Sequence, residues 1–387
     1  MDVYILDDTF RKQTVVDDFD SIIWAERFNE IGDFELVTAD NVRNRGIFGR
    51  GARIMIDKSD RVMQIERMTA SQDEQNVRKL TVKGRSIEKV LMGRLCWRSS
   101  SGLVDPQSPW TLIFTPVELM NYFINRVLIA GSHDTNNDPL PNLSTSRVGY
   151  PADGIPAPAD PVSWVVPGPR TMWEELHQIM TTYSLGYRMY ANGTNGLVYS
   201  NPYTGTDRSN TQTSNTPVIF STALDNISSM TSIDSIEPSV TAVSVYSSYG
   251  GTSVFQDASY GWDRVWVPLE VSEPEDLPTD QRTQYRQARG KAYLNNHVPV
   301  FALDGEVSKV SQYVYNQDYY LGDLVSLEDE YGNSNKMRVV EQIFSQDEKG
   351  EQAYPSFKTE LIITSDSWLG YDPAVVWPDA PGMWEEQ

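Results

Sequence analysis

The sequence has a single cysteine, Cys96, and only three histidines, His133, His177 and His297, among its 387 residues. One cysteine excludes an intramolecular disulfide framework and a metal cage built from thiolates. No histidine pair has the spacing of a zinc motif, and no nucleophile elbow, phosphate-binding loop or dinucleotide fingerprint is present. We therefore predict no metal, no cofactor and no catalytic residue.

Long apolar runs are also missing. The most apolar stretch, residues 110–130, is interrupted by Glu118, Asn121 and Arg126, which argues against a membrane span. Residues 1–4 have neither the basic nor the apolar segment of a secretory signal. The sequence thus predicts a protein that is made in a cytoplasm and stays free of disulfides.

Positive charge is scarce. The chain has 32 Lys and Arg against 53 Asp and Glu, a formal net charge of −21, and the acidic excess lies after the first hundred residues. Nucleic-acid binding requires a basic stripe, so this pattern argues against it. Two interpretations stay open: a surface that keeps the protein soluble, or an acidic wall past which DNA slides without sticking.

Apolar and aromatic side chains are plentiful. Hydrophobic residues make up 40% of the chain, and the aromatic residues are mostly the 20 Tyr and 10 Trp. These two residue types suit half-exposed strand faces and subunit interfaces. A chain of this length is too long for one ordinary core, so we predict two or three domains.

The first hundred residues read as strands. Alternating polar and apolar residues on either side of Gly32-Asp33 predict a hairpin, and a second pair of strands turns at residues 58–60. A third strand covers residues 79–83, and a short helix, residues 87–91, follows with Ser86 as its N-cap.

The rest of the chain mixes helices and strands. Capping boxes at residues 115–118 and 171–174 each predict the start of a helix, the first ending near residue 128 and the second near Gly186. A third helix, residues 280–295, is predicted to bury Tyr285, Ala288 and Ala292. The further strands are predicted at residues 187–190, 197–199, 218–220, 227–233, 240–246, 264–269, 298–303, 323–327, 338–344 and 357–363.

Two segments of the chain resemble each other. In the first, Gly51 precedes a strand at residues 53–56, a second strand starts at residue 65, and Ser-Gln-Asp-Glu follows at residues 71–74. In the second, Gly322 precedes a strand, residue 340 lies in the next one, and Ser-Gln-Asp-Glu follows at residues 345–348. The repeated order predicts two related β modules that flank an insertion.

Three stretches resemble the hub-protein family found at the distal tail end of siphophages, which is distantly similar to the baseplate hub of contractile-tailed phages. The stretches are Trp24-x-x-Arg27-Phe28-Asn29-Glu30-x-Gly32-x-Phe34-Glu35-Leu36, then Gly84-Arg85-Ser86-x-x-x-x-Leu91-x-x-Arg94, and finally Tyr320-Leu321-Gly322-Asp323 with the hairpin that runs on to Glu341. The first two stretches, taken together, are specific to this family.

The resemblance implies a mainly β fold, with two tail-tube-like β-barrel or sandwich domains that flank a mixed α+β insertion. We place the first tube-like domain at residues 1–98, the insertion at 99–229, the second tube-like domain at 230–365 and a C-terminal arm at 366–387. The family assembles as a trimer, so three copies would give a ring of six such domains on the tail tube.

The resemblance also implies a role and partners. The protein would be a non-enzymatic structural hub at the distal end of the virion tail. It would contact the distal tail protein, the tail-tube proteins, the tape measure protein and a fibre or tip protein, while DNA only passes through its channel. Larger family members carry a C-terminal peptidase or receptor-binding extension, which we do not expect here.

Other chemistry was weighed on the residues. The helical segment Glu174-Glu175-Leu176-His177 has no second histidine four residues away, so a zinc site is not favoured. Asp134-x-Asn136-x-Asp138 starts like a calcium loop but lacks the later glycine and glutamate. With 53 acids, paired carboxylates carry no signal for glycoside hydrolysis.

Two aromatic-rich stretches, residues 246–266 and 368–384, leave two roles open, a sugar-binding surface or a subunit interface. A carbohydrate-binding module for host recognition is therefore the alternative function, and a cell-wall-degrading enzyme is a third. For the terminal arm, an interface is the preferred interpretation.

Overall fold

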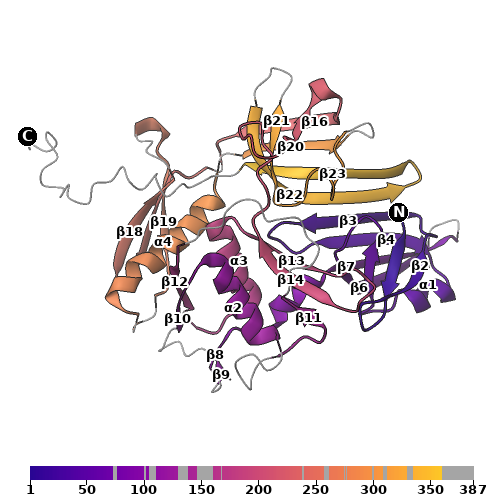
Figure 1. Cartoon of the computed structure of the whole chain (residues 1–387), viewed down its shortest axis with the longest axis horizontal. Coiled ribbons are helices and arrows are strands. Elements are labelled where there is room, and N and C mark those ends of the chain that lie inside the picture. Colours follow the sequence, from indigo (N-terminus) through magenta and orange to yellow (C-terminus); the bar gives the residue numbers. More distant parts are fainter. Residues whose placement is uncertain are drawn as a thin grey trace, which may run out of the picture.

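A computed structural model of the chain describes residues 1–72, 76–99, 102–103, 110–129, 138–145, 160–166, 168–237, 239–256, 261–273, 275, 277–298, 300–307, 312–328 and 334–359. Strands dominate and form several sheets, and the three longest helices gather at one end of the molecule (Figure 1). The prediction of a mainly β chain is confirmed.

The N-terminal β module comprises the first seven strands and one short helix. Its elements are β1 (Val3–Leu6), β2 (Lys12–Val16), β3 (Ser21–Arg27), β4 (Asp33–Ala39), α1 (Val42–Ile47), β5 (Arg53–Ile56), β6 (Met63–Gln72) and β7 (Arg78–Ser86). Strand β4 alternates between buried and less buried side chains along its length, and its buried face contributes Phe34 and Leu36 to the core. Each such fully buried side chain stabilises the fold by about 1.5–3 kcal/mol.

The predicted hairpins of this module are confirmed. Strands β3 and β4 pair antiparallel with Trp24 opposite Phe34, and β5 pairs with β6. The predicted helix after β7 is the 3-10 helix η1 (Ile87–Gly93). Ser86 is its N-cap, as predicted, but the Ser86 hydroxyl makes no capping hydrogen bond and instead accepts from the Gly32 N–H at 3.0 Å.

A helical domain follows. Its elements are β8 (Trp97–Ser99), β9 (Gly102–Leu103), β10 (Trp110–Phe114), α2 (Pro116–Leu128), β11 (Leu143–Ser144), β12 (Val162–Val166), α3 (Met172–Tyr183), β13 (Gly186–Tyr190) and β14 (Val198–Tyr203). Both predicted capping boxes are formed, with Thr115 and Glu118 bonding each other's backbone at the start of α2, and Thr171 and Glu174 doing so at the start of α3.

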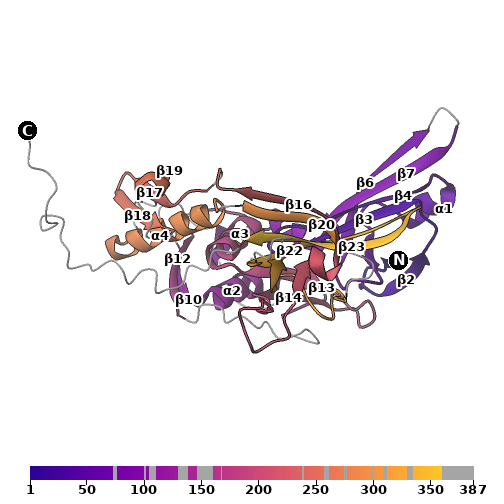
Figure 2. The ribbon, with the colours of Figure 1, turned by 90° about the horizontal axis from the view of Figure 1, so that it is seen from above.

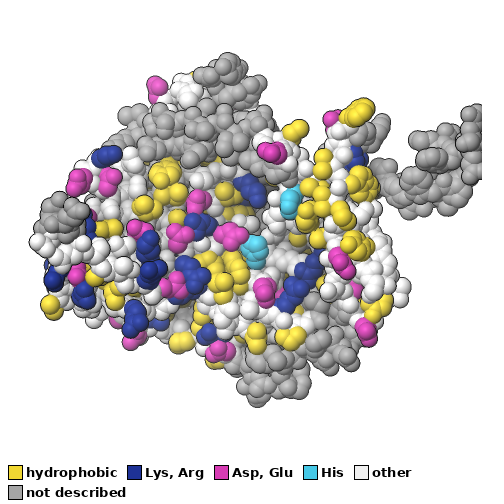
Figure 3. Space-filling model, turned by 180° about the vertical axis from the view of Figure 1, so that it is seen from behind, with side chains coloured by type: hydrophobic (Ala, Val, Ile, Leu, Met, Phe, Trp, Pro, Cys, Tyr) yellow, Lys and Arg dark blue, Asp and Glu magenta, His cyan; other side chains and the backbone are white. Residues whose placement is uncertain are grey.

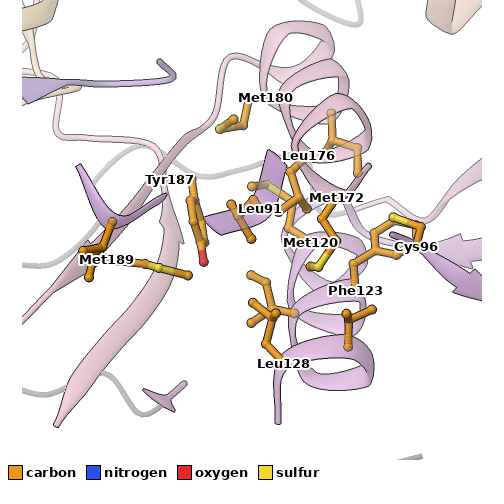
Figure 4. Packing of buried hydrophobic residues seen from close by; sticks show 14 of the residues in the cluster. Leu91, Cys96, Met120, Phe123, Leu128, Met172, Leu176, Met180, Tyr187 and Met189 are labelled. Atoms are coloured by element: carbon orange, nitrogen blue, oxygen red, sulfur yellow. The ribbon is translucent and has the colours of Figure 1, made fainter. Parts of the chain in front are cut away.

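The core of this domain lies between α2, α3 and the β13–β14 hairpin (Figure 4). Methionines from α2, α3 and β13 lie among the branched and aromatic side chains, where their flexible thioethers fill irregular gaps. Leu91 of η1 is fully buried in the same cluster, so the end of the N-terminal β module is anchored in the helical domain.

The remaining elements form two groups. They are β15 (Ile219–Ser221), η2 (Thr222–Leu224), β16 (Ile227–Ser235), β17 (Ala242–Ser247), β18 (Gly250–Phe255), η3 (Gly261–Asp263), β19 (Trp266–Glu270), α4 (Thr279–Asn295), β20 (Val300–Val307), β21 (Leu324–Glu328), β22 (Ser334–Asp347) and β23 (Gly350–Thr359). We call β15, β16 and β20–β23 the C-terminal β module, and β17–β19 with α4 the sheet–helix unit. The predicted continuation of β23 to residue 363 lies outside the described residues.

Strand β22 belongs to both β modules. Residues 334–338 pair with β21, residues 341–346 pair with β3, and β23 follows the opposite edge of β22. One sheet of eleven strands therefore runs through both modules, in the order β15-β21-β22-β3-β4-β7-β6-β5-β1-β2 with β23 beside β22.

The two similar sequence segments fold alike. Strands β5, β6 and β7 form an antiparallel meander, and so do β21, β22 and β23. Each meander is entered through a glycine with positive φ, Gly51 at +85° and Gly322 at +89°, whose N–H donates to the middle strand at 2.8 Å. Each middle strand has a bulge close to that hydrogen bond, at Ile65–Arg67 and at Val339–Glu341.

The sheet–helix unit has its own core. Val243, Val245 and Val254 pack with Leu294 of α4, and they share no side chain with the core of the C-terminal β module. The prediction for α4 is correct at Tyr285, which is buried, and at Ala288, which packs against the core of the helical domain, whereas Ala292 is only half-buried. Two arginines take the buried positions instead, Arg282 and Arg286, because the fully buried carboxylate of Glu273 pairs with both, at 3.2 and 2.7 Å.

The predicted domain boundaries stay a prediction. The core of the C-terminal β module includes Val218, Phe220 and Ile227, which precede the proposed boundary at residue 230. Seen from above, the modules and the sheet–helix unit form an elongated body, from which the far ends of β6 and β7 project as a two-stranded ribbon (Figure 2). Side chains along that part of β6 are mostly exposed.

Candidate functional site

The first and third of the stretches that carry the family resemblance meet at one place, which we call the junction. At its centre lies Phe28, directly after β3, with an exposed fraction of only 2%. Its N–H donates to the Val340 carbonyl in β22 at 2.9 Å, and its carbonyl accepts from the Tyr187 N–H of β13 at 3.1 Å. The backbone of Phe28 thus links β22 to the helical domain.

Two glycines make room for the Phe28 ring. A Cβ atom on Gly186 would lie 2.3 Å from a ring carbon of Phe28, and one on Gly322 would lie 2.6 Å from the same atom. Gly322 also has φ of +89°, a conformation that side-chain-bearing residues rarely adopt. The ring meets Tyr203 edge-on with centroids 5.3 Å apart, so aromatic packing completes the contact.

A buried arginine closes the other side of the ring. The guanidinium of Arg338, on β22, lies 4.9 Å from the Phe28 ring centroid. Its Nη1 donates to the carbonyl of Thr204 at 2.5 Å and to that of Gly322. One side chain therefore ties β22 to the segment after β14 and to the segment before β21.

Asp323 serves the same junction from the next position in sequence. Its carboxylate accepts from the Thr206 N–H at 2.7 Å and pairs with Arg208 at 2.8 Å. Burial raises the pKa of Asp323, while these partners favour the charged form and act against that rise. Nearer the surface, Arg27 pairs with Asp33 at 2.6 Å and with Glu341 at 2.8 Å.

A second polar network lies under the hairpin of β3 and β4. The carboxylate of Glu26 accepts hydrogen bonds from Trp24 Nε1 at 3.0 Å, from the Ser59 hydroxyl, and from the Tyr315 hydroxyl at 3.1 Å. Tyr315 precedes β21, so Glu26 joins the two β modules a second time. Complete burial raises the pKa of Glu26.

This raised pKa predicts a pH effect. Gln at position 26 can accept from Trp24 and Ser59 with its oxygen and donate to Tyr315 with its nitrogen, so Glu26→Gln should fold. Since the folded-state pKa exceeds the unfolded value of about 4.3, the wild type loses stability as pH rises from that value through the folded pKa. The advantage of Glu26→Gln should therefore grow with pH, by about 1.4 kcal/mol for each unit of pKa elevation.

Urea unfolding at pH 5 and pH 8 would measure this difference. Glu237→Gln, an exchange at an exposed position, controls for the loss of one charge. If the difference in unfolding free energy between the wild type and Glu26→Gln is the same at both pH values, the raised pKa of Glu26 is contradicted.

A third cluster joins the N-terminal β module to the β13–β14 hairpin. Arg61 pairs with Glu88 at 2.7 Å, and both side chains are almost fully buried. The same Glu88 oxygen accepts from the Met189 N–H at 2.7 Å, and Arg61 also donates to the Tyr203 hydroxyl at 3.4 Å. A buried pair of this kind costs desolvation energy, so its value here is to specify how the two parts fit.

The Gly-Arg-Ser stretch is structural as well. Gly84 lies where β7 crosses the bulge of β6, and a Cβ there would be 1.9 Å from the carbonyl oxygen of Gln64. The Arg85 guanidinium donates to both carboxylate oxygens of Glu66, at 2.8 and 2.9 Å. Arg94 pairs with Asp138 at 2.6 Å, and its carbonyl accepts from Met172 at the start of α3.

A cavity of about 370 Å³ lies beside this stretch. Its wall includes four basic side chains, but each has an acidic partner in the described residues: Arg53 with Asp8, Arg85 and Lys89 with Glu66, and Arg94 with Asp138. The cavity therefore offers no unpaired cation to an anionic ligand.

Those of the weighed metal ligands that the structure describes do not form a metal site. His177 lies 2.8 Å from Glu30 and stacks on Trp173, while Glu174 is used in the capping box. Asp138 pairs with Arg94, whereas His133, Asp134 and Asn136 lie outside the described residues. Across the described ranges, no group of three or more His, Cys, Asp or Glu side chains could hold a metal ion.

Cys96 is buried beside α3, and burial raises the pKa of its thiol. His297 stacks on Tyr293 with centroids 4.0 Å apart.

None of the helices in the described part of the chain has the length and apolar character needed to cross a bilayer.

Solved structures share this fold. The tail protein from Neisseria meningitidis MC58 is 15% identical, with a TM-score of 0.54 over 92% of this chain and 95% of that one. The 43 kDa tail protein of prophage MuSo2 from Shewanella oneidensis is 15% identical, with a TM-score of 0.52 over 92% and 98%. Prophage tail protein gp18 from Listeria monocytogenes EGD-e is 13% identical, with a TM-score of 0.51 over 96% and 98%.

The fold is thus that of phage tail proteins. The sequence from residue 2 to residue 357 matches the profile of the family described as Siphovirus ReqiPepy6 Gp37-like protein, and the chain belongs to this family of siphovirus tail proteins. No curated protein matches the sequence. The resemblance to siphophage tail proteins is therefore confirmed, and the chain is a component of the virion tail.

Proposed function

We propose that the chain is a structural hub at the distal end of the tail, where three copies form a ring. In this role the ring closes and orients the tail tube, anchors tip or fibre proteins, and leaves a channel through which DNA is ejected. The observation that carries the proposal is the duplicated meander, β5–β7 and β21–β23, fused through β22 into one sheet. Two modules per chain let three copies match a sixfold tube.

The buried charges support a non-enzymatic role. Arg61 with Glu88, Arg208 with Asp323, and Glu273 with its two arginines each join separate elements of the fold. Catalytic groups instead need a site where a substrate can reach them. We therefore propose that the chain acts mechanically, and that its partners are the distal tail protein, the tail-tube proteins, the tape measure protein and a fibre or tip protein.

Light scattering of the purified chain tests the ring. We expect a mass three times 43.8 kDa at micromolar concentration, and negative-stain images with a central channel. A chain that stays monomeric at 100 µM would contradict self-assembly into a trimer.

Paired variants sharpen this test. Ile23, on the outer face of β3, is 51% exposed, and Ile113, on β10 of the helical domain, is 66% exposed. If copies meet through their β modules, Ile23→Asp should weaken the trimer at least tenfold, whereas Ile113→Asp should leave its mass unchanged. If Ile23→Asp and Ile113→Asp change the trimer affinity by the same factor, the copies do not meet through their β modules.

A further inference from the structure

Among the residues that the structure describes, no helix covers one face of the sheet of β17, β18 and β19. Val243 and Val245 of the central strand β17 pack toward α4, so the alternate residues Ala242, Ser244 and Tyr246 face the other way. The sheet register places Phe255 and Trp266 on either side of Ala242. The two rings contact each other edge-on, with centroids 5.2 Å apart, and Ala242 between them is fully buried, so an aromatic pair covers this part of the outer face.

These rings are exposed to solvent. Trp266, Phe255 and Tyr246 are 47%, 44% and 43% exposed, and Trp262, just before β19, is fully exposed. Hydrophobic side chains gather at this end of the molecule in the view from behind (Figure 3). A contiguous exposed patch of this kind marks an interaction surface.

One cation lies within the patch. The guanidinium of Arg264 is 5.0 Å from the Phe255 ring centroid and 5.9 Å from that of Trp266. The Arg264 Nη1 atom is buried and, within the described ranges, has no hydrogen-bond partner. The surface therefore suits a partner that is aromatic or proline-rich and also acidic.

The C-terminal arm, residues 366–387, has this composition. It contains three tryptophans and three prolines, and it has acidic residues but no Lys or Arg. Its aromatic and proline residues are Trp368, Tyr371, Pro373, Trp377, Pro378, Pro381 and Trp384, and its acids are Asp366, Asp372, Asp379, Glu385 and Glu386. Proline-rich segments dock on aromatic surfaces at low entropic cost because they are already extended.

The place where the chain leaves the described region fits as well. Lys358 lines a small pocket together with Asn295 and Asn296, at the C-terminal end of α4. Residues 360–387 can span up to about 90 Å when extended, against about 25 Å for the whole of α4. The described chain therefore ends near α4, which covers the face of the sheet opposite the aromatic one.

We propose that the arm of one copy docks on this aromatic face of the next copy in the ring. The proposal rests on the trimeric hub of the previous section. An arm that leaves on the α4 side reaches a neighbour's outer face without wrapping around its own sheet, and its carboxylates meet Arg264. Each of the three arms would then clasp one neighbour.

A peptide titration tests the docking surface. The probe is a fluorescein-labelled peptide of residues 366–387, added to the chain truncated after residue 365, with fluorescence anisotropy as the readout. We expect saturable binding that weakens at least tenfold in Trp266→Ala and in Arg264→Glu. Ile113→Ala removes an exposed apolar side chain from another sheet and should leave the affinity unchanged.

Crosslinking tests exchange between copies. One full-length chain carries Ser253→Cys on the outer face, another carries Gln387→Cys on the arm, and Cys96 is replaced by Ala in both. After the two are mixed and allowed to exchange, a disulfide-linked pair of the two chains supports the proposal. A third chain carries both Ser253→Cys and Gln387→Cys. If this chain forms a disulfide within itself while the mixture of the other two forms no linked pair, the arm does not dock on a neighbouring copy.

The outcomes separate the two proposals. A truncated chain that stays trimeric but does not bind the peptide overturns the docking and spares the ring. A monomeric full-length chain whose truncated form binds the peptide overturns the ring and spares the surface. Glycan-array binding by the full-length chain that disappears in Trp266→Ala, together with no peptide binding, would assign the face to carbohydrate instead.

Discussion

Replacing Gly84 by alanine should lower the free energy of unfolding by about 3 kcal/mol or more. The added Cβ would lie 1.9 Å from the backbone oxygen of Gln64 and 2.7 Å from the Phe34 ring. A side chain can rotate away from such a clash, but the bulge of β6 holds the Gln64 carbonyl in place. Strands β6 and β7 would have to separate locally, next to the core residues of the N-terminal β module.

Gly93→Ala is the matched control, because no atom lies within 4 Å of a Cβ built at Gly93. Chemical unfolding followed by circular dichroism compares the two variants with the wild type. We expect Gly93→Ala to stay within about 0.5 kcal/mol of the wild type. A loss of less than 1 kcal/mol for Gly84→Ala would contradict the close approach of the strands.

Phe28→Ala and Gly186→Ala should each lower the free energy of unfolding, but the loss in the double variant should be smaller than the sum of the two single losses. Removing the Phe28 ring leaves a cavity at the junction and should cost about 3–5 kcal/mol. Gly186→Ala alone places a methyl group 2.3 Å from that ring and should cost about 2–3 kcal/mol. In the double variant the methyl group enters the cavity, so the total should fall short of the sum by about 1.5 kcal/mol or more.

A double-mutant cycle of urea unfolding measures this coupling. The Phe28 carbonyl would still lie 2.9 Å from the new methyl group, so part of the cost of Gly186→Ala remains. Gly46→Ala, which meets no atom within 4 Å, replaces Gly186→Ala in the control cycle with Phe28→Ala. Strict additivity at Phe28 and Gly186 would mean that the ring and the glycine do not share one space.

Local signals in the sequence predicted local structure well. Both capping boxes, the hairpins of β3–β4 and β5–β6, and the strands β13 and β14 form as expected, because each depends on residues that are neighbours along the chain. Strands β1, β2 and β18 were not predicted. The exposed residues of β2 and the paired glycines at the start of β18 give little alternation to detect.

The junction could not be predicted from the sequence. Arg27 and Glu341 pair across 314 residues, and no local pattern encodes which distant strand a hairpin will meet. The first and third family stretches did contain several of the residues that meet there, but they did not show that these residues meet. On α4, a helix rule that places small and apolar residues inside failed at Arg282 and Arg286, because their buried partner Glu273 lies on a separate segment.

The shared strand β22 has a mechanical consequence. A linker between two domains acts as a hinge, whereas β22 passes through both modules as one unbroken backbone bonded to β21, β3 and β23. Bending one module against the other would break several of these hydrogen bonds at once, so each chain should move as a stiff lever. If the chain forms the ring proposed above, a ring of such levers would open along the borders between copies, and little of the force of adsorption would be lost in bending the chains.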